Sequence, residues 1–346
     1  MSNSDNYSDN VLISFDDVLI KPKYSNIISR DMTDIYCNLS KNTLFAVPII
    51  SANMDTITEY EMALNMARMG GCGIVHRYMS IQRTENIVMS LLKEGVRPFM
   101  AVGSVHNDRE RIEFLLNVSE DIAICIDIAH GHSSHMRDTL KFIRHEKKSE
   151  CLVIAGNVAT PEGVADLANW GADVVKVGVG GGSVCTTREK TGIGIPQLSA
   201  IQLCARDANV HIIADGGIRK PSDAVKAIAA GATCIMIGGM LAGTDWTPGW
   251  KESYEAHAPM EYRGMASAQA RMSCNRASRY SEGVARRVLP KPPGSSESVL
   301  KEIVDGLRSA MSYVGAKNLE EFRQNVEFVR CSPSVVKENA PHFSDN

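Results

Sequence analysis

Several features typical of secreted, membrane and nucleic-acid-binding proteins are missing from this sequence. No run of about 18 apolar residues occurs, so no membrane-spanning helix is predicted. Residues 1–10 are polar and lack the apolar stretch of a secretion signal, so a cytoplasmic location is expected. The nine cysteines include no CxxC pair, which argues against a zinc site and a disulfide framework. The net charge is −3 and no Lys/Arg stripe interleaves with aromatic residues, so neither nucleic acid nor a membrane is an expected partner.

What the sequence does contain is a regular alternation of short apolar runs and helix-like segments. The apolar runs, which have the length of buried strands, are residues 47–51, 71–76, 98–104, 122–128, 151–157, 174–180, 211–217 and 233–239. Between them, the helical segments 161–171 and 221–231 have Pro near the start and Gly past the end. Eight such units within about 250 residues predict an α/β fold, a (β/α)8 TIM barrel, with a doubly wound open sheet as the alternative. We expect a single domain over residues 1–346, disordered over about 1–10.

The most distinctive stretch, residues 174–194, reads VVKVGVGGGSVCTTREKTGIG. A β-branched run leads into a polar, glycine-rich loop, so a buried strand delivers Cys185 to an exposed backbone. The amide groups of such a loop and the neighbouring Arg188 favour the nucleophilic thiolate form of a cysteine. The alternative interpretation is a glycine-rich turn with a structural cysteine, because free cysteines are often buried.

In a (β/α)8 barrel, the loops at the carboxyl ends of the strands carry the chemistry. Polar and glycine residues of this sequence gather at those positions. In chain order they are Asn53, Asp55, His76, Arg77, Asp127, His130, Asn157, Cys185, Asp215, Gly217, Gly238 and Gly239. Because the seventh and eighth loops of such barrels commonly bind phosphate, a phosphorylated small molecule is the expected ligand. His130 and His132 have no third candidate ligand, so a metal is not expected there.

Two connections are longer than the others. The first follows the sixth predicted strand and holds Cys185. The second, a flap over about residues 244–295, follows the eighth strand and contains YRGMAS and then an Arg-rich polar stretch. Long connections without regular structure are usually lids or disordered segments, so we expect an active-site loop after strand six and a flap after strand eight.

Eight segments of the sequence form a specific combination in their order and spacing. They are FDDVLI (15–20), SANMDT (51–56), AGNVAT (155–160), VGVGGGSVCTTR (177–188), ADGGI (214–218), YRGM (262–265), EG (282–283) and GLRSAMSYVGA (306–316). Together they resemble the IMP dehydrogenase and GMP reductase family over nearly the whole chain. The resemblance implies an oxidoreductase of purine nucleotide metabolism that assembles as a homotetramer.

The resemblance also implies where a purine ribonucleotide binds. The thiolate of Cys185 would attack C2 of the purine and form a covalent intermediate, a task suited to sulfur, and Asp215 would hold the ribose hydroxyls. The residues expected around the 5′-phosphate are Ser183, Gly217, Gly238, Gly239 and Tyr262. Those expected near the base are Gly264 and Met265.

A cofactor and a cation follow from the same resemblance. Hydride transfer needs a nicotinamide cofactor, yet no GxGxxG fingerprint follows a strand here. In the family the cofactor lies across the barrel mouth, so the expected contacts are Asp127, Asn157 and Arg77. The backbone carbonyls of Gly180, Gly182 and Cys185 would bind a monovalent cation such as potassium. Gly181 stands where the family usually has proline, which adds freedom to this loop.

The family contains two activities that share one intermediate. GMP reductase uses NADPH, expels ammonia and yields IMP, whereas IMP dehydrogenase uses NAD and hydrolyses the intermediate to XMP. Residues 80–97 leave no room for paired CBS modules and the flap is short, which favours the reductase. In the reductase, the residues matching Thr187 and Glu282 handle the proton delivered to departing ammonia.

Other segments, such as GCGIVHRYMSI and the C-terminal KENAPH, are closer to dehydrogenases. In those enzymes an Arg–Tyr dyad on a long flap activates water. Arg279 and Tyr280 resemble the dyad, but only Ser281 separates Tyr280 from Glu282, too little chain for the usual excursion. The predicted function is therefore GMP reductase, acting in purine salvage. The alternatives are an NAD-dependent IMP dehydrogenase and a non-catalytic purine-nucleotide-binding protein.

Overall fold

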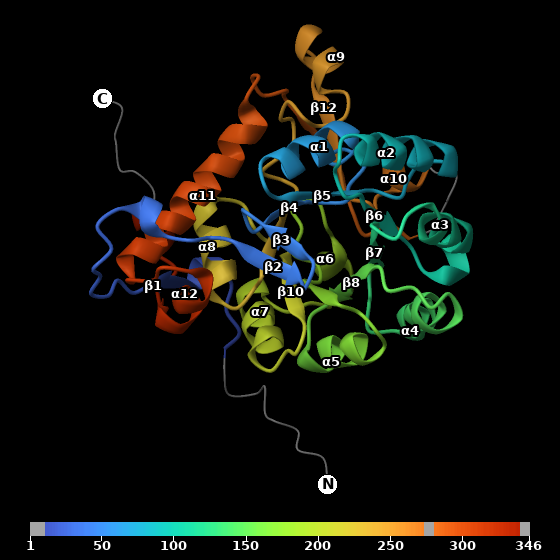
Figure 1. The fold of residues 1–346 in the computed structure, drawn as a ribbon. Helices are drawn as coiled ribbons and strands as arrows, with labels where there is room; N and C mark the ends of the chain where they lie inside the picture. Colours follow the sequence, from blue (N-terminus) through green and yellow to red (C-terminus); the bar gives the residue numbers. More distant parts are fainter. Residues whose placement is uncertain (1–10, 273–279, 340–346) are drawn as a thin grey trace.

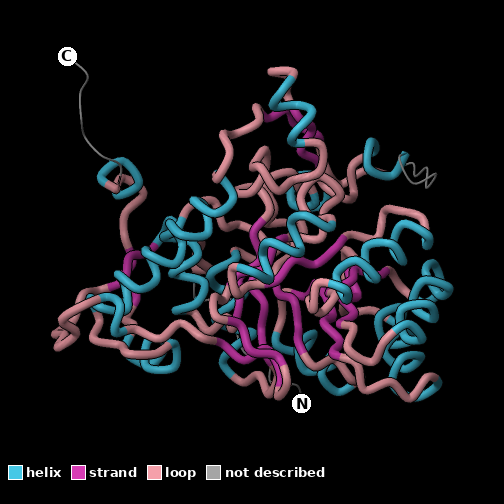
Figure 2. The backbone as a smooth tube through the Cα atoms, turned by 45° about the horizontal axis from the view of Figure 1, so that its top comes forward, coloured by secondary structure: helices cyan, strands magenta, loops and turns pink. Residues whose placement is uncertain are grey.

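A closed barrel of eight parallel strands forms the centre of the computed structural model, which describes residues 11–272 and 280–339 (Figures 1 and 2). The barrel strands are β4 (Ile49–Ser51), β5 (Cys72–Val75), β6 (Phe99–Val102), β7 (Ala123–Asp127), β8 (Leu152–Val158), β9 (Val174–Val177), β10 (His211–Asp215) and β11 (Cys234–Ile237). Strand β11 pairs with β4, with Ile235 opposite Ile49, so the sheet has no edge. This closure confirms the predicted (β/α)8 barrel and excludes the doubly wound open sheet.

Helices surround the barrel and connect one strand to the next (Figure 2). They are α1 (Tyr60–Arg68), α2 (Ile81–Lys93), α3 (Val105–Val118), α4 (Ser134–Lys141), α5 (Pro161–Asn169), α6 (Thr187–Thr191), α7 (Gln197–Arg206), α8 (Pro221–Ala229) and α11 (Ser295–Tyr313). Helices α5 and α8 begin at the prolines that the sequence placed at their starts, since proline fits the first turn. All eight predicted apolar runs overlap a barrel strand.

The strands are buried on both faces, which explains why they read as continuous apolar runs. On β7, Ala123 and Cys125 belong to one buried cluster, while Ile124 and Ile126 belong to a second. Alternate residues of a strand point to opposite faces, so one set fills the barrel and the other packs against the helices.

A hairpin covers the amino ends of the strands. It consists of β2 (Cys37–Ser40) and β3 (Thr43–Phe45). Arg97, which precedes β6, donates to the hydroxyl of Thr43 at 2.8 Å, and the rings of Phe45 and Phe99 lie 5.9 Å apart. This end of the barrel is therefore closed by packing, and the carboxyl ends of the strands remain as the place for a ligand.

The remaining elements lie around this core. They are η1 (Phe15–Asp17), β1 (Val18–Ile20), η2 (Arg30–Met32), η3 (Phe142–Glu146), α9 (Trp250–Glu255), β12 (Met260–Arg263), α10 (Ala268–Met272), β13 (Ala285–Val288), α12 (Leu319–Asn325), β14 (Phe328–Arg330) and α13 (Val335–Glu338). Strands β1 and β14 pair in antiparallel fashion, which brings the two ends of the described chain together beside α12 (Figure 1). Among the described residues, no helix combines the length and the apolar character that crossing a membrane requires. The expectation of disorder over residues 1–10 concerns residues outside the described range.

The predicted flap after β11 contains more regular structure than the sequence suggested. Within residues 244–295, helix α9 is followed by an antiparallel ribbon in which Tyr262 of β12 faces Arg286 of β13. The ribbon and α9 project from the barrel (Figure 1). Arg279 lies outside the described residues.

Candidate active site

A cavity of about 430 Å³ opens at the carboxyl ends of the barrel strands. The residues to which the resemblance to a GMP reductase assigned a catalytic, substrate, cofactor or cation role all line it. They are Arg77, Asp127, Asn157, Gly180, Gly182, Ser183, Cys185, Thr187, Asp215, Gly217, Gly238, Gly239, Tyr262, Gly264, Met265 and Glu282. Most of these residues follow barrel strands that are far apart in the sequence, and the closed barrel brings the strand ends to one mouth. Tyr262, Gly264, Met265 and Glu282 come from the flap.

The loop that carries Cys185 turns sharply where β9 ends. Gly178 has φ +144°, and a Cβ there would overlap the carbonyl oxygen of Asp215, so only glycine fits this position. Further along, the guanidinium of Arg188 donates to the carbonyls of Val179 and Ile195 at 3.1 and 2.6 Å. Arg188 therefore ties the two ends of the loop together.

Cys185 begins a chain of hydrogen bonds that ends on the flap. Its thiol donates to Oγ1 of Thr187 at 3.3 Å, and the Thr187 hydroxyl donates to Oε2 of Glu282 at 2.7 Å. The flap is also paired to the loop through the backbone, because the N–H of Thr186 donates to the carbonyl of Glu282 at 2.9 Å. Thiol, hydroxyl and carboxylate thus form one path along which a proton can move.

A polar cluster lies where the sequence predicted the phosphate. The hydroxyls of Ser183 and Tyr262 are 2.9 Å apart. A Cβ on Gly239 would lie 2.8 Å from Oγ of Ser183, and one on Gly238 would lie 3.6 Å from Oη of Tyr262. Gly217 has φ +79° and lies just past the end of β10, after Gly216. Burial raises the pKa of Tyr262, so its phenol remains a neutral hydrogen-bond donor.

Gly264 and Met265 line the same cavity, and Gly264 lies beside the Cys185 loop. The place of a Cβ on Gly264 is 3.0 Å from the carbonyl oxygen of Val184. The backbone N–H of Asp55 approaches the sulfur of Met265 at 3.4 Å. The carboxylate of Asp55 in turn accepts from Nη2 of Arg263 at 2.6 Å, which fixes the start of this segment.

The floor of the cavity holds a buried ion-pair network that the sequence analysis did not identify. The ammonium of Lys176, on β9, lies 2.6 Å from Oδ1 of Asp127 and 2.7 Å from Oδ2 of Asp215. Asn157 donates to the same Oδ2 of Asp215 at 2.8 Å. A lysine inside the otherwise apolar run VVKV was the available signal, because a buried lysine requires charged partners.

Charges in this network stabilise one another. Burial alone would raise the pKa of Asp127, but the Lys176 ammonium holds it below its usual value. Burial alone would lower the pKa of Lys176, but Asp127 and Asp215 hold it above its usual value. Asp127 and Lys176 are therefore both ionised near neutral pH.

Arg77 also lines the cavity, on a segment fixed by a buried histidine. Its guanidinium carbon is 5.1 Å from the centre of the Tyr78 ring. The backbone N–H of Tyr78 donates to Nδ1 of His76 at 3.0 Å, so Nε2 carries the proton that reaches Glu59 at 3.0 Å. Glu59 and His76 thereby hold the strand end that presents Arg77.

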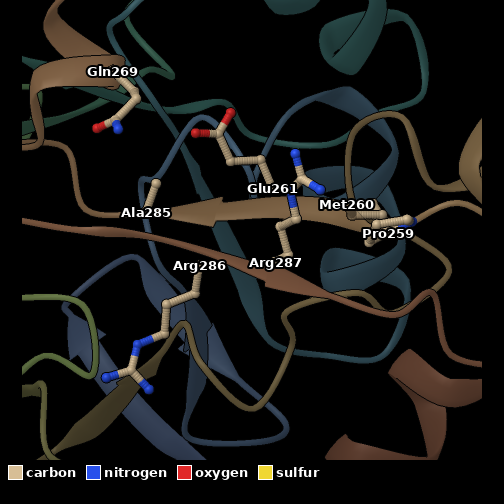
Figure 3. Close-up of a pocket in the computed structure, with 7 residues that line it drawn as sticks. All are labelled: Pro259, Met260, Glu261, Gln269, Ala285, Arg286 and Arg287. Carbon is tan, nitrogen blue, oxygen red and sulfur yellow. The ribbon is translucent and has the colours of Figure 1, made fainter.

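A second hollow of about 650 Å³ runs along the flap ribbon (Figure 3). Arg286 and Arg287 point to opposite sides of the ribbon, with Glu261 and Gln269 on the side of Arg287 (Figure 3). No residue to which the sequence assigned a role lines this hollow, although Glu261 and Arg286 are neighbours of Tyr262 on the ribbon. It therefore lacks the nucleophile and the carboxylates of the smaller cavity.

The structure also locates side chains that were considered for the dehydrogenase dyad and for a metal. Tyr280 is 80% exposed and is not among the residues that line the cavity, while its proposed partner Arg279 lies outside the described range. His130 and His132 have ring centres 6.5 Å apart. Within residues 11–272 and 280–339, no group of three His, Cys, Asp or Glu side chains is arranged to hold a metal ion.

Comparisons with known proteins extend this picture. Residues 12–342 match the model of the IMP dehydrogenase / GMP reductase domain. The chain belongs to this family. A GMP reductase of Phytophthora infestans is 39% identical over 336 residues, covering 94% of this chain and 92% of that protein. An inosine-5′-monophosphate dehydrogenase of Cryptosporidium parvum is 36% identical over 387 residues, covering 95% and 94%.

A solved structure has the same fold. The crystal structure of a GMP reductase variant from Trypanosoma brucei in complex with guanosine 5′-monophosphate superimposes with a TM-score of 0.84 at 26% identity. The match covers 97% of this chain and 99% of that one. As a member of this family, the chain is an oxidoreductase, and nicotinamide cofactors serve the family's reactions.

Proposed function

We propose that this protein is a GMP reductase, which converts GMP to IMP and ammonia with NADPH as the hydride source. The observation that carries the proposal is the hydrogen-bonded path from Cys185 through Thr187 to Glu282. Reductive deamination needs a nucleophile for C2 and a proton for the departing amine, and this path supplies both at one place.

In the first step, the thiol proton of Cys185 passes to Thr187, and the Thr187 proton passes to Glu282. The sulfur then bonds to C2 of GMP. The C2–N bond to the amino group breaks, and Glu282 returns its proton through Thr187, so that ammonia leaves. One thiol and one GMP thus give one thioimidate and one ammonia, with no other reactant required.

In the second step, a bound nicotinamide cofactor would supply the hydride that replaces sulfur at C2, so that Cys185 would leave as the thiolate and IMP would depart. The residues that fit the cofactor lie on the floor and rim of the cavity. Oδ1 of Asn157 is buried and has no hydrogen-bond partner among the described residues, so it can accept from a carboxamide. Asp127 and Arg77 line the same cavity and offer an acceptor and a cation.

GMP is proposed to bind with its ribose against Asp215. Oδ2 of Asp215 accepts from Lys176 and Asn157, and no hydrogen bond from any residue in the described part of the chain reaches Oδ1. That oxygen is available to the ribose hydroxyls. The 5′-phosphate then meets the cluster of Ser183, Gly217, Gly238, Gly239 and Tyr262, with Gly264 and Met265 near the base.

Further parts of the proposal rest on the family. A potassium ion would suit the carbonyls of Gly180, Gly182 and Cys185, because hard oxygen donors match a hard cation. The Gly182 carbonyl accepts from the N–H of Cys185 at 3.0 Å and keeps a second lone pair for the ion. We also propose that the enzyme is a single catalytic domain without CBS modules, assembles as a homotetramer and acts in the cytoplasm.

IMP dehydrogenase is the second candidate function. Its support is the near-equal identity of relatives with the two names, 36% and 39%. The exposure of Tyr280 and the contact between Glu282 and Thr187 favour the reductase, because the dehydrogenase needs the tyrosine near the reacting carbon.

The test is to incubate purified protein with GMP and NADPH in one reaction, and with IMP, NAD and potassium in another. Consumption of NADPH with release of ammonia supports the reductase. Formation of NADH with XMP in the second reaction alone would establish the dehydrogenase. Absence of turnover in both, with GMP still bound, would favour the non-catalytic binding protein.

A further inference from the structure

Lys176 occupies an unusual position for a charged side chain. Its side chain is 2% exposed and its ammonium contacts two carboxylates from different strands, Asp127 at the end of β7 and Asp215 at the end of β10. The catalytic path of Cys185, Thr187 and Glu282 does not include it. Its ammonium nevertheless lies at the floor of the same cavity.

The two carboxylates that Lys176 contacts serve different ligands in the proposed function. Asp215 faces the ribose of the nucleotide, and Asp127 faces the cofactor. Lys176 and Asn157 both donate to Oδ2 of Asp215, which fixes the rotation of that carboxylate and leaves Oδ1 as the acceptor for the ribose. One ammonium therefore sets the orientation of both acceptors relative to each other.

We propose that Lys176 is a positioning residue that couples the nucleotide site to the cofactor site by holding Asp127 and Asp215 in one rigid arrangement. The inference rests on the proposed function. Hydride transfer requires the donor carbon to lie close to C2, and small displacements of either ligand reduce the rate strongly. A single cation between the two anchoring carboxylates keeps that distance constant.

Packing alone does not explain the lysine. A methionine has a similar length and shape, so it would fill the interior of the barrel without charge, and buried ion pairs are often replaceable by apolar residues. Arg144, on η3, provides a matched control because it pairs with an aspartate at the other end of β9. It is partly buried and lies 2.6 Å from Asp173, the residue that precedes β9.

The experiment compares Lys176→Met with Arg144→Met, Asp127→Asn and Asp215→Asn. GMP affinity is measured by calorimetry without cofactor, and NADPH affinity by its fluorescence without GMP. Folding is followed by circular dichroism and thermal melting. These binding measurements need no turnover. A wild-type protein that binds GMP and NADPH but oxidises no NADPH refutes the reductase and leaves the coupling testable.

Lys176→Met is expected to lower the affinities for both GMP and NADPH by about 10- to 100-fold, the range for the loss of hydrogen bonds to charged groups. Asp127→Asn is expected to lower the affinity for NADPH alone, and Asp215→Asn is expected to lower the affinity for GMP alone. Arg144→Met lowers the melting temperature and leaves both affinities unchanged. Lys176→Arg, which keeps the charge, restores part of both affinities.

A folded Lys176→Met protein that binds both ligands as the wild type does, or loses only one of them, overturns the proposal. If that variant does not fold, Asp127→Asn is added to it. The wild-type network of Lys176, Asp127 and Asp215 has a formal net charge of −1. The double variant has the same formal charge, because Asp215 is its only remaining charged member. This double variant is expected to bind GMP about 10-fold more weakly than Asp127→Asn alone, and equal GMP affinity in the two also overturns the proposal.

Discussion

The barrel interior and the barrel mouth use the same residue types in different ways, and cysteine shows this most clearly. Cys125 of β7 lies inside the barrel with 1% exposure, and burial raises the pKa of its thiol to about 12. Cys185 lies at the mouth, partly exposed, with its thiol hydrogen-bonded to Thr187. The surroundings of a thiol, rather than its presence, decide whether it can act as a nucleophile.

Carboxylates differ between the mouth and the surrounding scaffold in the same way. Asp215 accepts two hydrogen bonds on one oxygen and keeps the other for a ligand. Asp245, at the start of the flap, uses both oxygens on the backbone, accepting from Gly294 and Ser296 at 2.7 and 2.8 Å. Asp215 at the mouth therefore keeps one carboxylate oxygen as a hydrogen-bond acceptor for a ligand, whereas both oxygens of Asp245 in the scaffold are already used.

The largest effect is expected from exchanging the nucleophile. Cys185→Ala should lower kcat by at least about 10⁴-fold, because the covalent route disappears. Cys125→Ala should leave kcat unchanged and lower the free energy of unfolding by about 1–3 kcal/mol through the cavity that it creates. Steady-state kinetics and urea unfolding of both variants measure this contrast. Comparable losses of kcat would remove the distinction between the two thiols.

A smaller loss is expected from the end of the proton path. Glu282→Gln keeps the shape but cannot take the Thr187 proton, so kcat should fall by about 10²- to 10⁴-fold. Glu189→Gln is the control, since Glu189 is exposed in the first turn of α6. Single-turnover release of ammonia is the measurement. An unchanged rate for Glu282→Gln would show that the proton travels by another route.

A glycine at the mouth, Gly178, and a glycine on the surface of the scaffold, Gly95, should differ in the stability that is lost on substitution by alanine. Gly178→Ala at the mouth should destabilise the protein by about 3 kcal/mol or more, because the added Cβ overlaps Asp215. Gly95→Ala, at φ +70° with no atom within 4 Å of its Cβ position, should cost only about 1 kcal/mol. Thermal unfolding of both variants checks the difference, and equal losses would mean that backbone conformation, not the overlap, is decisive.

The smallest effect concerns Asp245. Burial alone would raise its pKa, but the backbone N–H groups of Ser296 and Gly294 hold the pKa of Asp245 below the usual 3.8. A lowered pKa stabilises the fold above that value, and the contribution is lost as the pH falls through the folded pKa. Asp245→Ala should therefore cost about 1–2 kcal/mol at neutral pH, and less in acid. Unfolding measured across this pH range tests the sign, while kcat should stay unchanged.

Local signals in the sequence explain why so much of the fold was predictable. The apolar runs, the prolines at the starts of α5 and α8 and the glycines at the strand ends each specify their own conformation. Strand order then places Cys185 and Asp215 at one mouth. The contact of Glu282 with Thr187 came only from the family resemblance, because 95 residues separate the two in the chain.

Features that depend on contacts between residues far apart in the chain were missed. Nothing near Lys176 in the sequence names its partners, which lie 49 and 39 residues away. The flap ribbon was also missed, since β12 and β13 are short and pair across a long segment. In both cases the information lies in the closed barrel and in pairing between distant segments, which local periodicity does not encode.

The central claim is that Cys185 forms a covalent bond to C2 of GMP. The most direct test is peptide mass spectrometry after the protein has been incubated with GMP alone, quenched in acid and digested. The peptide containing Cys185 is expected to carry the added mass of GMP less ammonia, and the matching peptide of Cys185→Ala is expected to carry no such mass. An adduct on another cysteine, or NADPH-dependent turnover by the Cys185→Ala protein at the wild-type rate, would contradict it.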